Sequence, residues 1–270
     1  MIASPTVSVI IPCFNHGEFL PEAVSSVTAM DRDDVELIVV DDGSTDEHTR
    51  KEMDLLEANG IRVIRQPNKG LAAARNAGIL ASKGEYIFPL DADDRVRAGN
   101  IEHGIRVLDA NPRVGVVYGD VQFFGVRTGL WTAGPFSPNR LMRQNYIACS
   151  AVFRRVIWEQ NGGYDGTMPV QGFEDWDLWL GAFEHGWEFA YVPEVLFEYR
   201  KHQESMLTRA LKREEEVAVF VARKHGALYR QAWLELAQEH DSGRATFRNL
   251  RRIVNARIKH KLGMNGNHVE

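Results

Sequence analysis

The sequence has few cysteines, no long apolar run and only a small excess of acidic charge. No segment approaches the roughly 20 apolar residues that a membrane-spanning helix needs, and the first residues, MIASPTVSVIIPCFN, lack the basic segment of a signal peptide. We therefore expect a cytoplasmic protein. Cys13 and Cys149 lack metal-site spacing, so we interpret them as buried thiols in a reducing compartment. The net charge of −5 gives no indication of nucleic-acid binding.

Two common phosphate-binding motifs are also missing. The chain has neither G-x-G-x-x-G after a strand nor G-x-x-x-x-G-K-[ST], which excludes the dinucleotide fingerprint and the phosphate loop. If the protein binds a phosphorylated ligand, a metal ion and basic side chains must neutralise the charge. Lys69 and Arg75, at the start of a predicted helix, are candidates for this, although Arg75 could equally be a helix-surface charge.

The first hundred residues alternate between strand and helix patterns. Buried strands are predicted at 7–11, 36–40, 61–64 and 85–90. Helices are predicted between them, the second capped by Ser44 or Thr45 and the third spanning 71–82. This alternation predicts an α/β fold with a mostly parallel sheet and helices on both faces.

After residue 112 the rhythm changes. A strand pair is predicted over 114–124, a loop or lid over 125–139 and a strand over 147–155. A helix from Glu174 to Gly186 and two strands, at 187–192 and 195–200, follow. From about Leu207 the pattern is helical to the end, with a break near residue 242.

Carboxylates stand where two of the predicted strands end. Asp41 and Asp42 follow the second strand, and FPLDADD places Asp91, Asp93 and Asp94 after the fourth. Ligands of open α/β sheets bind at this edge. In an extended segment Asp91 and Asp93 point the same way, which suits Mg²⁺ or Mn²⁺ shared with a phosphate group. Taken alone, D-x-D is weak evidence, and a solvated acidic turn is the more common explanation of such a pattern.

Several motifs together carry a family resemblance. VSVIIPCFN, ELIVVDDGSTD, NKGLAAARNAG and GEYIFPLDADD, followed by GGYDG, GFEDWDLWL and YRKHQES, resemble family 2 glycosyltransferases over residues 6–207. The resemblance implies a GT-A type, Rossmann-like, mostly parallel sheet flanked by helices, with a C-terminal helical extension. It divides the chain into a nucleotide-sugar-binding half (1–110), an acceptor-binding half (111–206) and the extension (207–270).

The resemblance also implies roles for residues of the first half. It predicts Mn²⁺ or Mg²⁺ as cofactor, held by Asp93 with Asp91 and His202. The donor would be a nucleoside-diphosphate sugar, with UDP the first choice. Its predicted contacts are Pro12, Phe14, Asn15, Asp41, Asp42, Lys69, Gly70, Arg75, Asp91, Ala92 and Arg200.

For the second half, the resemblance implies the catalytic group. Asp175 would be the general base that takes the proton from an acceptor hydroxyl. Glu174 and Trp176 would contact the acceptor, a saccharide or a lipid-linked molecule, although a tryptophan here could equally pack in the core. The implied reaction is a single displacement that inverts the anomeric centre, in surface polysaccharide or glycan assembly.

Other interpretations stay open at this point. A haloacid-dehalogenase-like phosphatase also places D-x-D after an apolar strand, but there the motif opens the fold. A non-catalytic nucleotide-sugar-binding module and a nucleotidyltransferase are further alternatives. The basic segment 244–263 carries an apolar stripe, which suits either the inner face of a membrane or docking on the protein itself.

Overall fold

A computed structural model describes residues 6–30, 32–97, 99–203 and 210–241. The chain forms two compact units, Met1–Lys224 and His225–Glu270. In the second unit the described element is helix α10 (Gly226–Asp241). The basic segment 244–263 lies outside the described residues, and the three-part division of the chain stays a prediction. No helix among the described residues combines the length and apolar character needed to cross a membrane.

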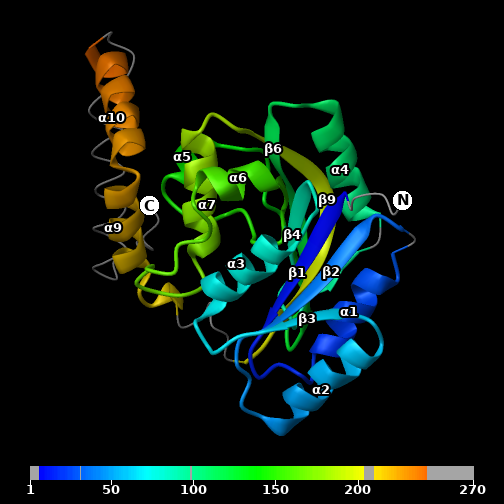
Figure 1. The fold of residues 1–270 in the computed structure, drawn as a ribbon. Coiled ribbons are helices and arrows are strands. Elements are labelled where there is room, and N and C mark those ends of the chain that lie inside the picture. Colours follow the sequence, from blue (N-terminus) through cyan, green and yellow to red (C-terminus); the bar gives the residue numbers. More distant parts are fainter. Residues whose placement is uncertain (1–5, 31, 98, 204–209, 242–270) are drawn as a thin grey trace, which may run out of the picture. The chain divides into compact units, whose positions relative to one another are not determined.

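The first half of the larger unit is a parallel sheet with alternating helices (Figure 1). Its strands run side by side in the order β3-β2-β1-β4. The strands are β1 (Val7–Cys13), β2 (Val35–Asp41), β3 (Arg62–Arg65) and β4 (Tyr86–Pro89). The helices are α1 (Leu20–Thr28), α2 (Glu47–Ala58) and α3 (Leu71–Ala81). The predicted alternation is therefore confirmed here.

The alternating side chains of β1 separate two layers of packing. Val7, Val9 and Ile11 face a core that includes buried residues of α1 and α2. Ile10 points to the other face, where α3 lies so close that a Cβ on Gly78 would be 2.4 Å from the Ile10 side chain. Every residue of β1 is buried because both faces of the sheet are covered.

The predicted cap of α2 is wrong by one or two positions. Asp46, not Ser44 or Thr45, is the N-cap, and its Oδ1 accepts a 2.7 Å hydrogen bond from the Thr49 N–H. Ser44 and Thr45 instead bond to Asn15, whose backbone has a positive φ of 56°. These bonds join the loop after β1 to the loop after β2.

The second half completes a mixed sheet. Its elements are β5 (Arg95–Val96), α4 (Asn100–Ala110), β6 (Val114–Gly125), β7 (Gly129–Trp131), α5 (Pro138–Leu141), β8 (Val152–Arg154), α6 (Arg155–Gln160), α7 (Glu174–Glu184), β9 (Glu188–Lys201) and α9 (Glu214–Lys224). Among the described residues the sheet order is β3-β2-β1-β4-β8-β6-β9-β5, with β7 beside β6. Strand β8 is antiparallel to β4 and β6, whereas β6 and β9 are parallel.

The predicted strand pair over 114–124 is one strand, β6, and the two predicted strands after α7 are one strand, β9. Register shifts between these strands fall at Gly119 and Asp120. Gly119 is not a turn residue: a Cβ there would be 2.5 Å from the Glu194 carbonyl oxygen, so glycine permits close approach of two backbones.

Two more predicted boundaries change. The predicted strand over 147–155 is confined to β8, and the chain turns directly into α6. The predicted loop 125–139 contains β7 and the start of α5. The β6–β7 hairpin brings Trp131 beside Val121, which places that ring next to the site described below.

Candidate active site

Two adjoining cavities lie where the strands of the first half end. The larger has a volume of about 640 Å³ and the smaller about 320 Å³. Leu71, Asp91 and Tyr199 line both. The larger cavity, called the donor cleft below, collects these predicted site residues: Pro12, Phe14, Asn15, Asp42, Gly70, Asp91, Ala92, Asp93 and His202. The smaller, called the acceptor cavity, contains Arg75, Glu174 and Asp175.

Asp42 organises the wall of the donor cleft. Its Oδ1 accepts hydrogen bonds from Gln66 Nε2 at 2.7 Å and from the Lys69 N–H at 2.9 Å, and its Oδ2 accepts one from the Gly70 N–H at 2.8 Å. The carboxylate is buried, so these donors replace the water it has lost. Gly70, with φ of +88°, then begins α3.

Some predicted donor contacts do not line the donor cleft. Asp41 is buried and its Oδ1 accepts a 2.8 Å bond from the Ser44 N–H. Lys69 contributes its backbone N–H to Asp42. Arg75 and Arg200 are held by carboxylates, as described next.

Arg75 bridges the two cavities. Its guanidinium is 1% exposed, donates to Asp91 Oδ1 at 2.6 Å and forms a second, short ion pair with Glu174 Oε1. Burial opposes its charge, but Asp91, Cys149 and Glu174 attract the cation and the pKa of Arg75 is raised overall. Glu174 Oε2 also accepts the Gly172 N–H at 2.8 Å. Arg75 thereby fixes a carboxylate of each cavity in place.

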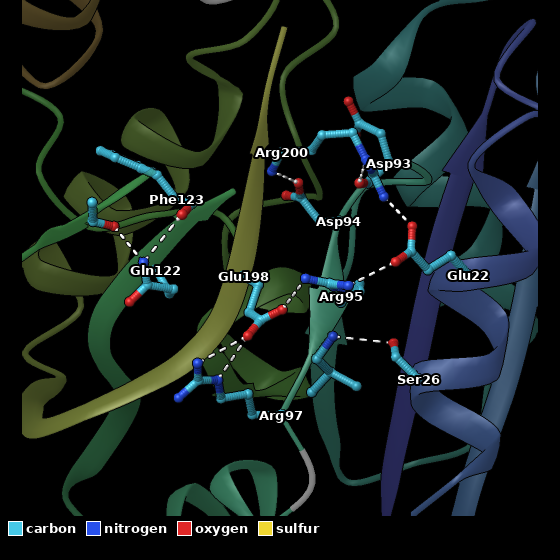
Figure 2. A network of polar contacts seen from close by, with 12 residues as sticks. Glu22, Ser26, Asp93, Asp94, Arg95, Arg97, Gln122, Phe123, Glu198 and Arg200 are labelled. Carbon is cyan, nitrogen blue, oxygen red and sulfur yellow. Dashed lines mark hydrogen bonds and ion pairs between the residues drawn. The ribbon is translucent and has the colours of Figure 1, made fainter. Parts of the chain in front are cut away.

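Asp93 and His202 meet across the donor cleft, with 2.7 Å between Oδ2 and Nε2. Next to them, Arg200 donates through Nε to the Asp93 carbonyl at 2.8 Å and through its backbone N–H to Asp94 Oδ1 at 2.8 Å. Figure 2 shows Arg200 also reaching Glu22 of α1. Arg200 therefore anchors the segment that carries Asp93.

A second ion-pair cluster continues this anchor away from the cleft. Arg95 pairs with Glu22 at 2.7 Å and with Glu198 at 2.5 Å, and Glu198 also pairs with Arg97 at 2.9 Å (Figure 2). The cluster ties α1, β5 and β9 together directly behind the D-x-D segment. Asp94, buried beside Asp93 and Asp91, has a raised pKa because it is desolvated and lies near those two charges.

The side chains predicted to bind a metal fit a hard divalent cation only in part. Among the described residues, no group of three or more His, Cys, Asp or Glu side chains converges on one point. Asp93 and His202 do converge, and Mg²⁺ or Mn²⁺ commonly takes its remaining ligands from water and substrate phosphate. Asp91, the third predicted ligand, gives Oδ1 to Arg75. Asp93 and His202 are thus the residues that would hold a metal.

Asp175 occupies the first turn of α7, at the wall of the acceptor cavity. Its Oδ1 accepts hydrogen bonds from Asn145 Nδ2 and from the Trp176 N–H, both at 2.9 Å. Burial, then repulsion by Glu174, raises the pKa of Asp175 to about 7, against the lowering effect of Arg75 and of these bonds. A carboxylate with this pKa can accept a proton near neutral pH.

Trp176 lies in the core rather than at either cavity. Its ring is 1% exposed, and its Nε1 donates a 2.6 Å hydrogen bond to the Leu141 carbonyl. Because no face of the ring is accessible, this geometry leaves it no contact with a sugar. The sequence left two roles open for Trp176, acceptor contact and core packing, and core packing is the one observed.

Several residues of the two cavities were not anticipated. Gln171 lines the donor cleft, and Trp131, Asn145, Cys149 and Lys201 line the acceptor cavity. They come from separate loops and strands; Lys201 lies in the YRKHQES motif, and the others belong to no charged or repeated pattern. The usable signals were the two regions 125–139 and 146–151, which the sequence led us to expect around the acceptor site; they include Trp131 and Cys149 but indicate no particular residue.

Comparison with known proteins identifies the family. Residues 8–164 match the family described as Glycosyl transferase family 2, which is more than half of the chain. The protein belongs to this family. The glycosyltransferase GlyG of Streptococcus pneumoniae is 38% identical over 120 residues, which are 43% of this chain and 40% of GlyG. An uncharacterized glycosyltransferase of Rickettsia prowazekii is 29% identical over 80% of this chain and 70% of the relative.

Not every relative is matched along most of its length. The chain spans 38% of the length of an uncharacterized glycosyltransferase of Rickettsia felis, with 27% identity over 81% of this chain. Among solved structures, Staphylococcus aureus TarS 1–349 in complex with UDP superposes with a TM-score of 0.62 and 17% identity, covering 77% of this chain and 63% of TarS. At that identity the likeness shows the fold, and it confirms the predicted GT-A architecture.

The chain thus belongs to glycosyl transferase family 2 and has a GT-A fold, as the resemblance implied. Its membership of this family gives no support to the phosphatase alternative. The two cavities, one at the ends of the parallel strands and one beneath α7, can now be assigned functions.

Proposed function

We propose that this protein is an inverting glycosyltransferase that moves a sugar from a nucleoside-diphosphate sugar to an acceptor hydroxyl. The observation that carries the proposal is the position of Asp175 in a cavity that adjoins the donor cleft at Asp91, Leu71 and Tyr199. A sugar held at this junction has the donor's diphosphate on one side and the carboxylate of Asp175 on the other. That is the arrangement that a single in-line displacement needs.

The donor cleft supplies recognition of the nucleotide. Phe14 is 43% exposed, so its ring is free to contact a base, and Asn15 lies beside it in the same loop. Asp42 holds the opposite wall through the backbone of Lys69 and Gly70. Asp91 and Ala92 also line the donor cleft, and Asp91 lines the acceptor cavity as well.

Two complexes of the structural relative support UDP as the first nucleoside diphosphate to test. TarS 1–349 has been solved with UDP and with UDP-GlcNAc, the latter with 18% identity and a TM-score of 0.62 to this chain. Those ligands are properties of TarS. For this chain we propose a UDP-sugar, with the identity of the sugar set by residues such as Gln171 at the mouth of the cleft.

In the proposed reaction, Asp175 accepts the proton of the acceptor hydroxyl while the acceptor oxygen bonds to the anomeric carbon. The bond from that carbon to the diphosphate oxygen breaks, and its electron pair leaves with the nucleoside diphosphate. Glu174, fixed by Arg75, is placed to orient the acceptor. Bound Mg²⁺ or Mn²⁺, held by Asp93 and His202, would supply neutralisation of the diphosphate charge.

We place the protein in saccharide assembly at the cytoplasmic side of a membrane, with a saccharide or lipid-linked acceptor. The basic segment 244–263, which lies outside the described residues, would provide the membrane contact. Liposome flotation tests this: the full chain should float with anionic vesicles, and a chain ending at His240 should not. Equal flotation of the two would contradict the membrane contact without affecting the proposed reaction.

The donor is tested by thermal unfolding with UDP, GDP, dTDP, CDP and ADP, each with and without Mn²⁺. A ligand at one hundred times its dissociation constant adds about 2.7 kcal/mol, which raises the Tm of a domain of this size by several degrees. We expect UDP with Mn²⁺ to give the largest shift. If no nucleoside diphosphate shifts the Tm under either condition, the proposed function is wrong.

A further inference from the structure

The two carboxylate oxygens of Asp175 have different surroundings. Oδ1 accepts two hydrogen bonds, from Asn145 Nδ2 and from the Trp176 N–H, each at 2.9 Å. Among the described residues, none donates to Oδ2. Asp175 and Asn145 both line the acceptor cavity. The proton acceptor for an incoming hydroxyl is therefore Oδ2, since Oδ1 is already engaged on two sides.

Asn145 is rigidly held although it belongs to an irregular segment. The next residue, Tyr146, is 1% exposed and its hydroxyl accepts the Ser137 N–H at 2.8 Å. The Ile147 carbonyl accepts Nε1 of Trp179, a core residue of α7, at 3.2 Å. Because both following residues are fastened to the core, the Asn145 amide is positioned before any substrate arrives.

The amide orientation is set by Asp175 itself. Asn145 Oδ1 is buried and has no hydrogen-bond partner among the described residues. Turning the amide over would place that oxygen against the carboxylate of Asp175, so the donor must face it. An amide that leaves its own oxygen unpaired in order to donate to a carboxylate is typical of a group selected for that one bond.

We propose that Asn145 is a positioning residue for the general base: its hydrogen bond fixes Oδ1 of Asp175, directs Oδ2 to the acceptor hydroxyl and stabilises the ionised form of the carboxylate. The proposal rests on the function proposed above. Asn145 has no place in the motifs that indicate the family, and it does not need to touch the donor. Its effect passes through Asp175.

The electrostatic surroundings explain why such a donor is needed. Burial and the adjacent Glu174 raise the pKa of Asp175 to about 7, and Arg75 is the main opposing charge. Arg75 is already paired with both Asp91 and Glu174, which limits what it can offer a third carboxylate. The other titratable groups that face the site are Asp91, Cys149, Tyr164, Tyr199, Lys201 and Glu214.

The test measures proton affinity directly and needs no acceptor. The protein is labelled with ¹³C at the aspartate carboxyl carbons, and each resonance is titrated between pH 4 and 9 in the ligand-free full chain. The Asp175 signal is assigned as the one missing from Asp175→Asn. In the unsubstituted protein its midpoint should lie near 7. In Asn145→Leu, which keeps similar volume but removes the donor, it should rise by about one pH unit or more.

Two further variants make the result decisive. Gln144→Leu alters the exposed neighbouring residue of the same segment and should leave the midpoint where it was. Asn145→Asp keeps the shape but places a second carboxylate against the first, so the midpoint should rise further than in Asn145→Leu. Asn145→Asp also provides the measurement if the leucine variant does not fold.

The proposal would be overturned if the Asp175 midpoint were the same in the unsubstituted protein, Asn145→Leu and Asn145→Asp. A midpoint near 4 in the unsubstituted protein that Asn145→Leu does not move would also overturn it. Neither result concerns nucleotide binding. Failure of the proposed function would instead be seen as absence of any nucleoside-diphosphate shift in thermal unfolding. The two failures are therefore distinguishable on the same preparation.

Discussion

The donor cleft and the acceptor cavity hold their carboxylates by different means. In the donor cleft, Asp42 is satisfied by two backbone N–H groups and one side-chain amide. In the acceptor cavity, Glu174 depends on the buried guanidinium of Arg75, and Asp175 receives one amide and one backbone donor. The three N–H donors hold Asp42 in one orientation, whereas burial and the adjacent Glu174 raise the pKa of Asp175 to about 7 and leave it close to a proton-transfer equilibrium.

The difference separates the two tasks of the site. A cleft that recognises a ligand needs constant charge and constant shape, which short local hydrogen bonds provide. A cavity that moves a proton needs a group with comparable populations of both protonation states near the working pH. The junction at Asp91 belongs to both, since its Oδ1 binds Arg75 while the residue also lines the donor cleft.

The largest expected effect separates catalysis from donor binding. Asp175→Asn removes the proton acceptor while keeping the size of the side chain. We expect the rate of sugar transfer to fall by about 10²–10⁴-fold. The Tm shift produced by UDP with Mn²⁺ should stay unchanged, because the donor cleft is intact. Initial rates of UDP release in the presence of acceptor measure the first quantity.

A matched control for that change is Glu159→Gln, which alters an exposed carboxylate on α6. Its transfer rate should equal that of the unsubstituted protein. If Asp175→Asn transfers sugar at the full rate, another group is the base. If Asp175→Asn also loses the UDP shift, the two cavities are not separable as described here.

The next effect is on stability at the junction. Arg75→Met leaves Glu174, 2% exposed, and Asp91 without their cation, and breaking a buried ion pair in this way costs about 3–5 kcal/mol. For a domain of this size the Tm should fall by roughly 10 °C. Differential scanning calorimetry at pH 7.5 measures the change.

Arg62→Met is the corresponding change at the surface. Arg62 pairs with Glu36 at 3.2 Å and its side chain is 48% exposed, so its loss should cost about 0–1 kcal/mol. Equal Tm values for the two variants would show that the Arg75 bridge contributes no more than a surface pair.

The two cavities also differ in how far the sequence could predict them. Asp42 directly follows β2, and Asp91 and Asp93 come shortly after the buried strand β4. Parallel strands bring their carboxyl ends to one edge, so the convergence of these residues was predictable. Asn145 and Trp131 reach the acceptor cavity through an irregular segment and a short hairpin. Nothing local to either residue indicates its partner, because the contact with Asp175 spans 30 positions.

Where local patterns misled, a tertiary contact was responsible. The strand pair predicted over 114–124 is a single strand, because Gly119 permits the close approach of β9 to β6. Arg75 suggested a phosphate ligand at a helix start, and the structure buries it between two carboxylates contributed by distant segments. Trp176, in the motif that carries the proposed base, is buried in the core and donates a hydrogen bond to the Leu141 carbonyl. In each instance the decisive partner lies far along the chain.

Activity should depend on pH through the acceptor cavity. Because the pKa of Asp175 is raised to about 7, the base becomes protonated as the pH falls below 7, and kcat/KM should drop about tenfold per pH unit there. Folding stability should change with pH in the opposite direction to activity. The folded protein binds this proton more tightly than the unfolded chain, so protonation of Asp175 favours the folded state. The contribution is fully present below pH about 4 and is lost as the pH rises through 7.

Rates between pH 5 and 9, with unfolding in urea measured over the same range, check both statements. In Asp175→Asn the stability component that declines between pH 4 and 7 should be smaller than in the unsubstituted protein. An acid limb near pH 4 would contradict the raised pKa.

The smallest expected effect concerns the backbone-held carboxylate of the donor cleft. Asp42→Asn replaces one accepting oxygen by an NH₂ group, so at least one of the donors on Gln66, Lys69 and Gly70 loses its acceptor in a buried position. That should cost about 1–3 kcal/mol of folding free energy and weaken UDP binding. Asp175→Asn, by contrast, removes a carboxyl that burial already disfavours in its charged form and should cost less. Urea unfolding at pH 7.5 compares the two variants, and a larger loss for Asp175→Asn than for Asp42→Asn would contradict this order.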